Sequence, residues 1–189
     1  MNIEKTKIDG LLIIEPQVFG DERGFFVETY NKERYFDAGV SVEFVQDNLS
    51  KSAKGVLRGL HFQKEPSSQG KLVQVIQGRV LDVAVDIRHG SPTFGEYVSV
   101  ELSGENKKQF WIPAGFAHGF VSLEDDTIFL YKCTNLYSPE LEGAIMWNDR
   151  DLNIDWKLKE NGIEKPVISE KDQENILLKD IEKDFEYNK

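Results

Sequence analysis

The sequence predicts an all-β fold, a jelly-roll double-sheet barrel with a few short helices. Three observations indicate this fold: apolar and polar residues alternate over short segments, turn residues separate these segments at regular intervals, and few stretches carry apolar residues at helical spacing. The 189 residues contain no internal repeat, low-complexity tract or linker. We therefore expect residues 1–189 to form a single domain.

The first strongly patterned segment, residues 58–63, carries a histidine between two turn signals. Gly59 precedes His61, and the turn-forming run 66–70 follows it. These neighbours predict that His61 lies in or beside a strand.

Two longer strands are expected next, at residues 72–76 and 80–87, joined by a turn at Gln77–Gly78. In the second strand, alternation places apolar side chains on one face (Val83, Val85, Ile87) and mainly acidic ones on the other (Asp82, Ala84, Asp86). Further short strands are expected at residues 97–102, 109–112, 120–123 and 127–131. The even spacing of these strands favours a double-sheet barrel.

Helix is expected only at residues 32–38 and near the C-terminus. Ser169 resembles a helix N-cap that is followed by acidic residues in the first turn. Apolar residues then recur at helical spacing (Ile176, Leu177, Ile181, Phe185). The polar residues Glu182 to Lys189 are expected to fray.

Composition narrows the classes of function. The net charge of −10 argues against sequence-independent binding to nucleic acid. The chain opens without the basic start and apolar core of a signal peptide and has no apolar run of about 20 residues, so we expect no membrane span. The single Cys133 cannot form an internal disulfide, which favours the reducing cytoplasm.

Positive charge is concentrated in residues 51–90, where seven Lys or Arg face three Asp or Glu, a local excess of four. A basic region in an acidic chain indicates a pocket for a small anion. Arg58, His61 and Lys71 fall in this region. Histidine has a reference pKa of about 6.5 and can accept a proton at neutral pH, and a nearby cation can stabilise the negative charge that results.

A packed or surface histidine is the simplest reading of His61, and a metal site is another. His61, His118 and a distant carboxylate could ligate a metal. However, metal-binding β-barrels commonly place a Glu near paired histidines, and here the residue is Gln63. Metal-free acid–base chemistry is therefore the preferred use of His61.

Five segments resemble the dTDP-4-dehydrorhamnose 3,5-epimerase family, and the resemblance extends over about Gly20 to Asp172. They follow one another in the expected order: Arg58-Gly-Leu-His-Phe-Gln63, Gly90-Ser-Pro-Thr-Phe-Gly95, Ile112-Pro-Ala-Gly-Phe-Ala-His-Gly-Phe120, Leu130-Tyr-Lys-Cys-Thr134 and Glu142-Gly-Ala-Ile-Met-Trp-Asn-Asp149. The resemblance implies a cupin-type jelly roll. It also implies epimerisation of dTDP-4-dehydro-6-deoxy-D-glucose at C3 and C5, without metal or cofactor, to dTDP-4-dehydro-L-rhamnose.

The resemblance assigns four catalytic roles. His61 would remove the proton beside the C4 ketone, Asp172 would orient His61, Lys71 would stabilise the enolate oxygen, and Tyr131 would return a proton from the opposite face. Without the resemblance, Tyr131 reads as a packed core residue, Asp172 as support for a helix N-terminus, and Lys71 as a solvated charge at a strand end.

The resemblance also implies a substrate-binding set and a homodimer that exchanges N-terminal strands, so that Arg23 and Glu28 could complete the partner's site. The binding residues are Arg23, Phe26, Glu28, Gln46, Asp47, Asn48, Arg58, Lys71, His118, Tyr137, Glu142 and Lys171. Of these, the cations suit a diphosphate, and Phe26 and Tyr137 could stack on thymine. Three alternatives stay open: an epimerase of C3 only or C5 only, a metal-dependent cupin, and a sugar-nucleotide-binding module without catalysis.

Overall fold

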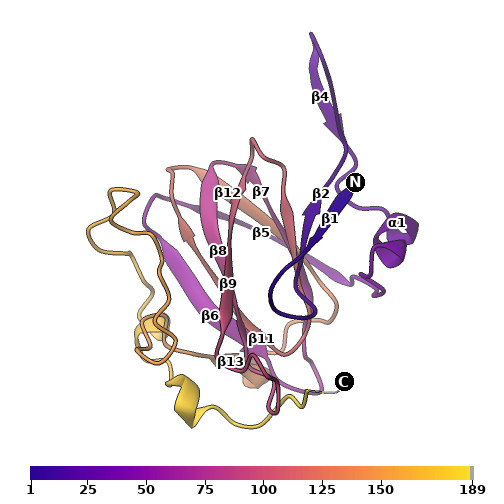
Figure 1. Ribbon diagram of the computed structural model, residues 1–189. Helices are drawn as coiled ribbons and strands as arrows, with labels where there is room; N and C mark the ends of the chain where they lie inside the picture. The colour runs from indigo at the N-terminus through magenta and orange to yellow at the C-terminus, as the bar shows by residue number, and fades with distance from the viewer. Residues whose placement is uncertain (188–189) are drawn as a thin grey trace.

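The computed structural model describes residues 1–187 and contains two facing antiparallel sheets (Figure 1). The six-stranded sheet has the order β1 (Asn2–Lys5), β2 (Leu12–Glu15), β10 (Gln109–Ile112), β7 (Lys71–Gln77), β12 (Thr127–Cys133) and β5 (Gln46–Ser52). The five-stranded sheet has the order β13 (Glu142–Ala144), β6 (Leu57–Gln63), β11 (Phe116–Ser122), β8 (Arg79–Asp86) and β9 (Tyr97–Ser103). This arrangement confirms the predicted double-sheet fold.

The strand pair β7–β8 forms as predicted, with its turn at Gly78. Gly78 has φ +77°, and a Cβ there would collide with Thr127, so the turn requires glycine. In β8 the predicted alternation is confirmed, because Val83 and Val85 belong to one core cluster and Ala84 to another. Both faces of β8 are buried, and apolar side chains accordingly occur on both of them.

Three apolar clusters hold the fold together. The cluster between the two sheets includes Val73, Phe110 and Phe129. A second cluster lies between the five-stranded sheet and the C-terminal segment and includes Trp156 and Phe185. The third packs α1 (Lys32–Asp37) on the outer face of the six-stranded sheet.

The two predicted helical regions differ in outcome. The helix at residues 32–38 is confirmed as α1, which is capped by the side chain of Asn31. Up to residue 187, the end of the described part, the C-terminal region contains only two short 3₁₀ turns, η2 (Lys171–Gln173) and η3 (Leu178–Asp180). A third such turn, η1 (Pro139–Leu141), lies earlier in the chain. The predicted C-terminal helix with Ser169 as its N-cap is therefore wrong. The backbone bonds with the barrel instead, through a bridge between Ile145 and Ile176 and a hydrogen bond from the His89 N–H to the Phe185 carbonyl.

The end of the described chain is anchored, not frayed as predicted. Phe185 is buried, and the backbone N–H of Tyr187 donates to the carbonyl of His89. Arg88 lies between the rings of Phe116 and Tyr187, at 4.4 and 4.9 Å from their centroids. The expected fraying of residues 188–189 lies outside the described residues.

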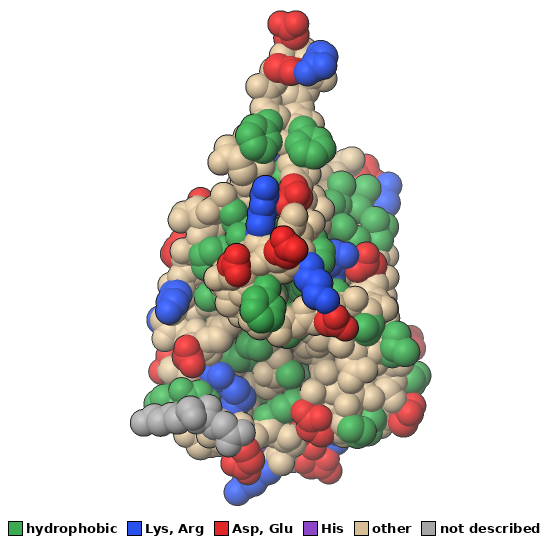
Figure 2. Space-filling view, turned by 90° about the vertical axis from the view of Figure 1, so that its right-hand side faces the viewer, with side chains coloured by type: hydrophobic (Ala, Val, Ile, Leu, Met, Phe, Trp, Pro, Cys, Tyr) green, Lys and Arg blue, Asp and Glu red, His purple; other side chains and the backbone are tan. Residues whose placement is uncertain are grey.

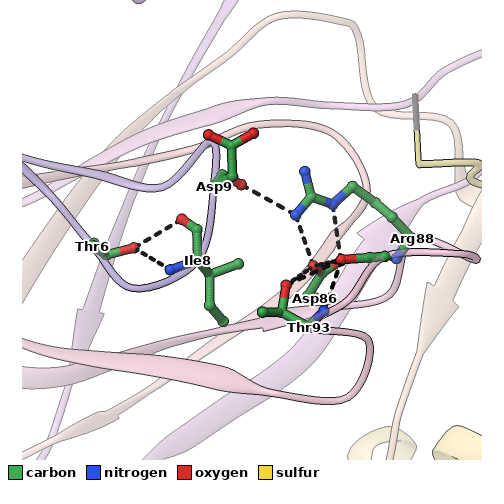
Figure 3. A network of polar contacts seen from close by, with 7 residues as sticks. Thr6, Ile8, Asp9, Asp86, Arg88 and Thr93 are labelled. Carbon is green, nitrogen blue, oxygen red and sulfur yellow. Dashed lines mark hydrogen bonds and ion pairs between the residues drawn. The ribbon is translucent and has the colours of Figure 1, made fainter. Parts of the chain in front are cut away.

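Asp86, at the end of β8, organises the neighbouring turn (Figure 3). Its carboxylate accepts hydrogen bonds from the Arg88 guanidinium at 2.7 and 2.9 Å, and from the hydroxyls of Ser91 and Thr93 at 2.6 and 2.7 Å. Burial alone would raise the pKa of Asp86, but these donors outweigh it and hold the pKa below its ordinary value. The network connects Arg88 to the backbone of Asp9 at 3.1 Å and so joins the turn to the N-terminal loop.

A hairpin, β3 (Val18–Asp21) and β4 (Gly24–Val27), projects from the two sheets (Figure 1). Figure 2 shows hydrophobic side chains along this projection and charged ones at its tip. Phe19, Phe25 and Phe26 are each at least 60% exposed. Exposed aromatic side chains on a projecting ribbon indicate a protein contact surface.

In the part of the chain that the structure describes, residues 1–187, no helix has the length and apolar character needed to cross a membrane.

Candidate active site

Two histidines face each other across neighbouring strands of the five-stranded sheet. His61 on β6 is in register with His118 on β11. The strands approach closely where Gly59 meets Gly119, since a Cβ on Gly59 would lie 2.5 Å from the Gly119 Cα. Gly59 also has φ +133°, a backbone conformation that glycine adopts readily and other residues rarely adopt. The Arg-Gly-Leu-His and His-Gly-Phe motifs thus meet at one place because glycine permits the contact.

These histidines line a cavity of about 470 Å³ between the two sheets. All four predicted catalytic residues line it: His61 from β6, Lys71 from β7, Tyr131 from β12 and Asp172 from η2. Arg58, His118, Glu142 and Lys171 of the predicted binding set line it too. Residues separated by more than a hundred positions therefore converge on one chamber.

His61 and Asp172 form a close pair at the cavity wall. Nε2 of His61 lies 2.6 Å from Oδ1 of Asp172, whose side chain is almost fully buried. Burial would raise the pKa of Asp172, but the hydrogen bond and charge of His61 and the hydrogen bonds from Ser169 and the Gly59 backbone lower it below its ordinary value. Asp172 is therefore a carboxylate at neutral pH and accepts the Nε2 proton. The unprotonated nitrogen of a neutral His61 is then Nδ1.

Tyr131 approaches the same cavity from the opposite sheet. Its strand, β12, lies between β5 and β7, with Tyr131 opposite Asn48 and Val73. Burial raises the pKa of Tyr131 above its ordinary value, and the Cys133 thiol acts in the same direction. The phenol therefore stays protonated at neutral pH and can donate a proton.

Lys71 begins β7 and lines the cavity. Burial lowers the pKa of Lys71, while the nearby Cys133, Asp82 and Glu142 act to raise it. A desolvated ammonium group interacts strongly with any negative charge that develops beside it.

A second cavity of about 340 Å³ opens beside the first and shares His61, Lys71, Tyr131 and Glu142 with it. It adds Gln46, Asn48 and Tyr137 of the predicted binding set.

Tyr137 is held at this second cavity by two contacts. Its backbone N–H donates to Oε1 of Gln46 at 2.9 Å, and its hydroxyl donates to Glu142 at 2.8 Å. Glu142 also pairs with Lys171. Burial would raise the pKa of Glu142, but the hydrogen bonds from Lys171 and Tyr137 lower it, so Glu142 is a carboxylate.

Four of the predicted residues lie away from both cavities. Asp47 is on the outer face of β5, where it accepts hydrogen bonds from Lys132 at 2.9 and 3.0 Å. Its neighbours Gln46 and Asn48 point inward because strand side chains alternate. The projecting hairpin carries Arg23, which pairs with Asp21, and Phe26. Glu28 follows the hairpin and pairs with Arg34.

Two residues of the site were not identified from the sequence. Asp82, on β8, is fully buried and contacts His118. An acidic residue inside an apolar strand was a usable signal, because a buried carboxylate requires a partner. Ser50 lines the first cavity, and its buried hydroxyl has no hydrogen-bond partner among residues 1–187. Nothing local to Ser50 distinguishes it from a surface serine.

The structure brings together no group of three or more His, Cys, Asp or Glu side chains suited to holding a metal ion, within the residues it describes. Nε2 of His61 and Nε2 of His118 each pair with a carboxylate, Asp172 and Asp82 respectively.

The sequence matches the family model described as dTDP-4-dehydrorhamnose 3,5-epimerase over residues 5–180. It is 57% identical to the dTDP-4-dehydrorhamnose 3,5-epimerase of Shigella flexneri, with 91% of this chain and 93% of the relative aligned.

Solved structures of related enzymes have the same fold. An epimerase from Legionella pneumophila in complex with dTDP-4-keto-L-rhamnose superimposes with a TM-score of 0.94 at 53% identity, covering 100% of this chain and 99% of that one. A 3'-monoepimerase from Streptomyces bikiniensis in complex with dTDP-quinovose superimposes with a TM-score of 0.85 at 34% identity, covering 92% and 86%.

Proposed function

The chain belongs to the dTDP-4-dehydrorhamnose 3,5-epimerase family, and from that premise we propose that its inter-sheet cavity converts dTDP-4-dehydro-6-deoxy-D-glucose to dTDP-4-dehydro-L-rhamnose by inverting C3 and C5. One observation carries the assignment of residues. A histidine–carboxylate pair and a protonated tyrosine enter the same cavity from facing sheets, and the half-buried Lys71 lines that cavity as well. Inversion of a carbon requires a base on one face and an acid on the other, since a single group would restore the original centre.

His61 is the base in this proposal, and Nδ1 is the atom that accepts the proton. Asp172 holds the Nε2 proton at 2.6 Å, which leaves the Nδ1 lone pair free. The proton comes from the carbon next to the C4 ketone. The C–H electron pair forms a double bond between that carbon and C4, and the π pair of the C4 carbonyl moves onto its oxygen to give the enolate. The resulting imidazolium is stabilised by the Asp172 carboxylate.

Lys71 stabilises the enolate oxygen. Its side chain is half-buried at the cavity, and burial lowers its pKa, so its ammonium group is already in place when the charge develops. Removing a donor of this kind costs on the order of 10²- to 10³-fold in rate.

Tyr131 returns a proton to the opposite face of the carbon, and the enolate electron pair forms the new C–H bond. His61 then carries one extra proton and Tyr131 lacks one. Exchange with water restores both groups, so protons balance over the cycle. The same steps at the second carbon complete the double inversion.

The nucleotide end of the substrate is assigned to the second cavity and its rim. Gln46, Asn48 and Tyr137 supply polar groups and an aromatic ring for thymine. Arg58 and Lys171 lie at the first cavity and carry the positive charge that a diphosphate needs.

A homodimer completes the proposal. The projecting hairpin carries Arg23 and Phe26, with Glu28 just beyond it, outside the cavities of its own chain. Its exposed phenylalanines would be covered by a second copy, and Arg23 would add a cation to the partner's phosphate site. A cytoplasmic location is part of the same proposal, supported by the lone thiol of Cys133, which rules out an internal disulfide.

Proton NMR in deuterated water tests the reaction. The purified protein, incubated with dTDP-4-dehydro-6-deoxy-D-glucose without added metal, should place deuterium at both C3 and C5 as the L-sugar accumulates. Deuterium at C3 alone would indicate single epimerisation, as in the Streptomyces relative named a 3'-monoepimerase. Absence of deuterium at both carbons would refute the proposed function.

Mixing two inactive variants tests the shared site. Arg23→Ala removes the hairpin cation, and His61→Ala removes the base. If the hairpin of one chain serves the cavity of the other, mixed dimers contain one intact cavity, and an equal mixture should recover about a quarter of wild-type activity. No recovery, in dimers shown to exchange subunits, would mean that Arg23 serves its own chain or no site.

A further inference from the structure

The inward-pointing side chains of β5 form a polar row along the wall of the two cavities. Because strand side chains alternate, this row consists of Gln46, Asn48, Ser50 and Ser52. Gln46 and Asn48 line the second cavity, and Ser50 lines the first. The hydroxyl of Ser50 is shielded from solvent and has no hydrogen-bond partner among residues 1–187. A buried hydroxyl without a partner is uncommon in a folded protein and therefore requires an explanation.

The other members of the row already have partners. Nε2 of Gln46 donates to Oδ1 of Asn48 at 3.0 Å. Nε of Arg58 donates to the hydroxyl of Ser52 at 3.3 Å. In the described part of the chain, Ser50 is thus the member of this row whose hydrogen-bonding capacity is left for a ligand.

We propose that Ser50 is a substrate-binding residue whose hydroxyl forms a hydrogen bond with the C2 hydroxyl of the hexose. The inference rests on the proposed function, because it takes the reacting carbons of the sugar to lie at Tyr131 and the diphosphate to lie at Arg58. Ser50 would then recognise a part of the sugar that takes no part in proton transfer.

The order of groups along β5 carries this assignment. Asn48 lies opposite Tyr131, the acid that meets the reacting carbons. Ser52 holds Arg58, which is assigned to the diphosphate. Ser50 lies between Asn48 and Ser52 on the same face of the strand. In the sugar, C2 likewise lies between C3, which is inverted, and C1, which carries the diphosphate.

The surroundings of Ser50 favour a neutral ligand group over a phosphate oxygen. Ser50 lies opposite Phe129 in the register of β5 and β12, and Phe120 and Leu57 line the same cavity. Burying a charge among such side chains costs far more than burying a hydroxyl that finds one partner. Rotation about the Cα–Cβ bond moves a serine hydroxyl among staggered positions, so it can turn toward a ligand while the strand stays in place.

Calorimetric binding of sugar nucleotides that lack the C4 ketone tests this contact separately from catalysis. One ligand, dTDP-6-deoxy-D-glucose, carries the C2 hydroxyl, and the other, dTDP-2,6-dideoxy-D-glucose, lacks it. Ser50→Ala should bind the first about 3- to 10-fold more weakly than wild type does, the effect of one hydrogen bond between uncharged groups. It should bind the second within about twofold of wild type. Equal losses for both ligands, or no loss for either, would overturn the proposal.

Binding of dTDP without the sugar shows which part of the ligand meets Ser50. Its affinity for Ser50→Ala should stay within about twofold of that for wild type. A loss as large as that of dTDP-6-deoxy-D-glucose would assign the hydroxyl to the phosphates and overturn the proposal. Ser99→Ala is the matched control, because Ser99 is an exposed strand serine on β9 that lines neither cavity. It should bind all of these ligands as wild type does.

The stability of the ligand-free protein separates a binding role from a structural one. Ser50→Ala removes a buried hydroxyl that has no partner among residues 1–187, so its urea midpoint should not fall below that of wild type. A lower midpoint would mean that the hydroxyl stabilises the fold, and the proposal would be overturned. If the binding results are as expected but the wild type places no deuterium in the keto-sugar, the proposed function fails and the contact between Ser50 and the C2 hydroxyl is retained.

Discussion

Asp172→Asn is the substitution that most directly tests how the cavity makes a base. The change keeps the size of the side chain and removes its charge. In the wild type, Asp172 accepts the Nε2 proton of His61 at 2.6 Å. The amide can instead donate to Nε2, which would place the imidazole proton on Nδ1 and eliminate the lone pair that accepts the substrate proton.

The magnitude follows from this geometry. The contact is short, and the Asp172 side chain is only 5% exposed, so solvent weakens it little. A hydrogen bond to a charged group contributes about 1.5–3 kcal/mol, which corresponds to about 10- to 150-fold in rate. Inversion of the tautomer adds to this loss. We therefore expect kcat to fall about 10²- to 10⁴-fold, with KM changed less than about threefold.

The assay is the initial rate of deuterium uptake by the keto-sugar at saturating substrate, followed by proton NMR. Glu170→Gln is the control, because Glu170 is exposed, lies two residues away and loses the same charge. Its rate should stay within about twofold of wild type. If Asp172→Asn kept a rate within about threefold of wild type while folded, Asp172 would not orient the base, and the assignment of Nδ1 would have to be abandoned.

Three further outcomes are expected. Tyr131→Phe should still take up deuterium but fail to accumulate the inverted sugar, and wild-type yield of that sugar would show that Tyr131 is not the acid. Burial lowers the pKa of Lys71 and raises that of Tyr131, so kcat should fall at alkaline pH, below the ordinary lysine pKa of about 10.4, as the Lys71 ammonium deprotonates. Lys71→Arg should move this alkaline fall in kcat to higher pH. If the fall does not move, it belongs to another group. Gly59→Ala should lower the free energy of unfolding by at least about 2 kcal/mol in urea titrations, since its Cβ would lie 2.5 Å from the Gly119 Cα at φ +133°, and an unchanged midpoint would mean that the two strands can separate freely.

Local patterns in the sequence were sufficient for the central strands β6 to β12, but β1 to β5 and β13 were not predicted. Alternation over residues 80–87 predicted a strand because side chains of an extended chain point to opposite faces in turn. A turn was predicted at Gln77–Gly78 and a short helix at residues 32–38, and both are present, with Asn31 capping the helix. These features depend on interactions within a few residues, which the sequence displays directly.

The candidate site was only partly predictable for the same reason. The motif around His61 and the later Tyr131 could be recognised from the sequence, and both line the cavity. Asp47 was grouped with Gln46 and Asn48, but alternation along β5 sends it to the outer face. Which face of an edge strand points inward depends on the sheet that it joins.

The C-terminal segment and the buried acids depended on the tertiary structure. Ser169 and the apolar residues after it have the spacing of a helix, yet bonds to distant strands hold the segment along the barrel, where Asp172 reaches His61 from 111 residues away. Asp82 reads as one polar residue in an apolar strand until β11 brings His118 against it. The sequence by itself determined the central strands, the Gln77–Gly78 turn and the residue types suited to proton transfer. The tertiary structure alone decided which carboxylate meets which imidazole, because these distances are set by packing between residues far apart in the chain.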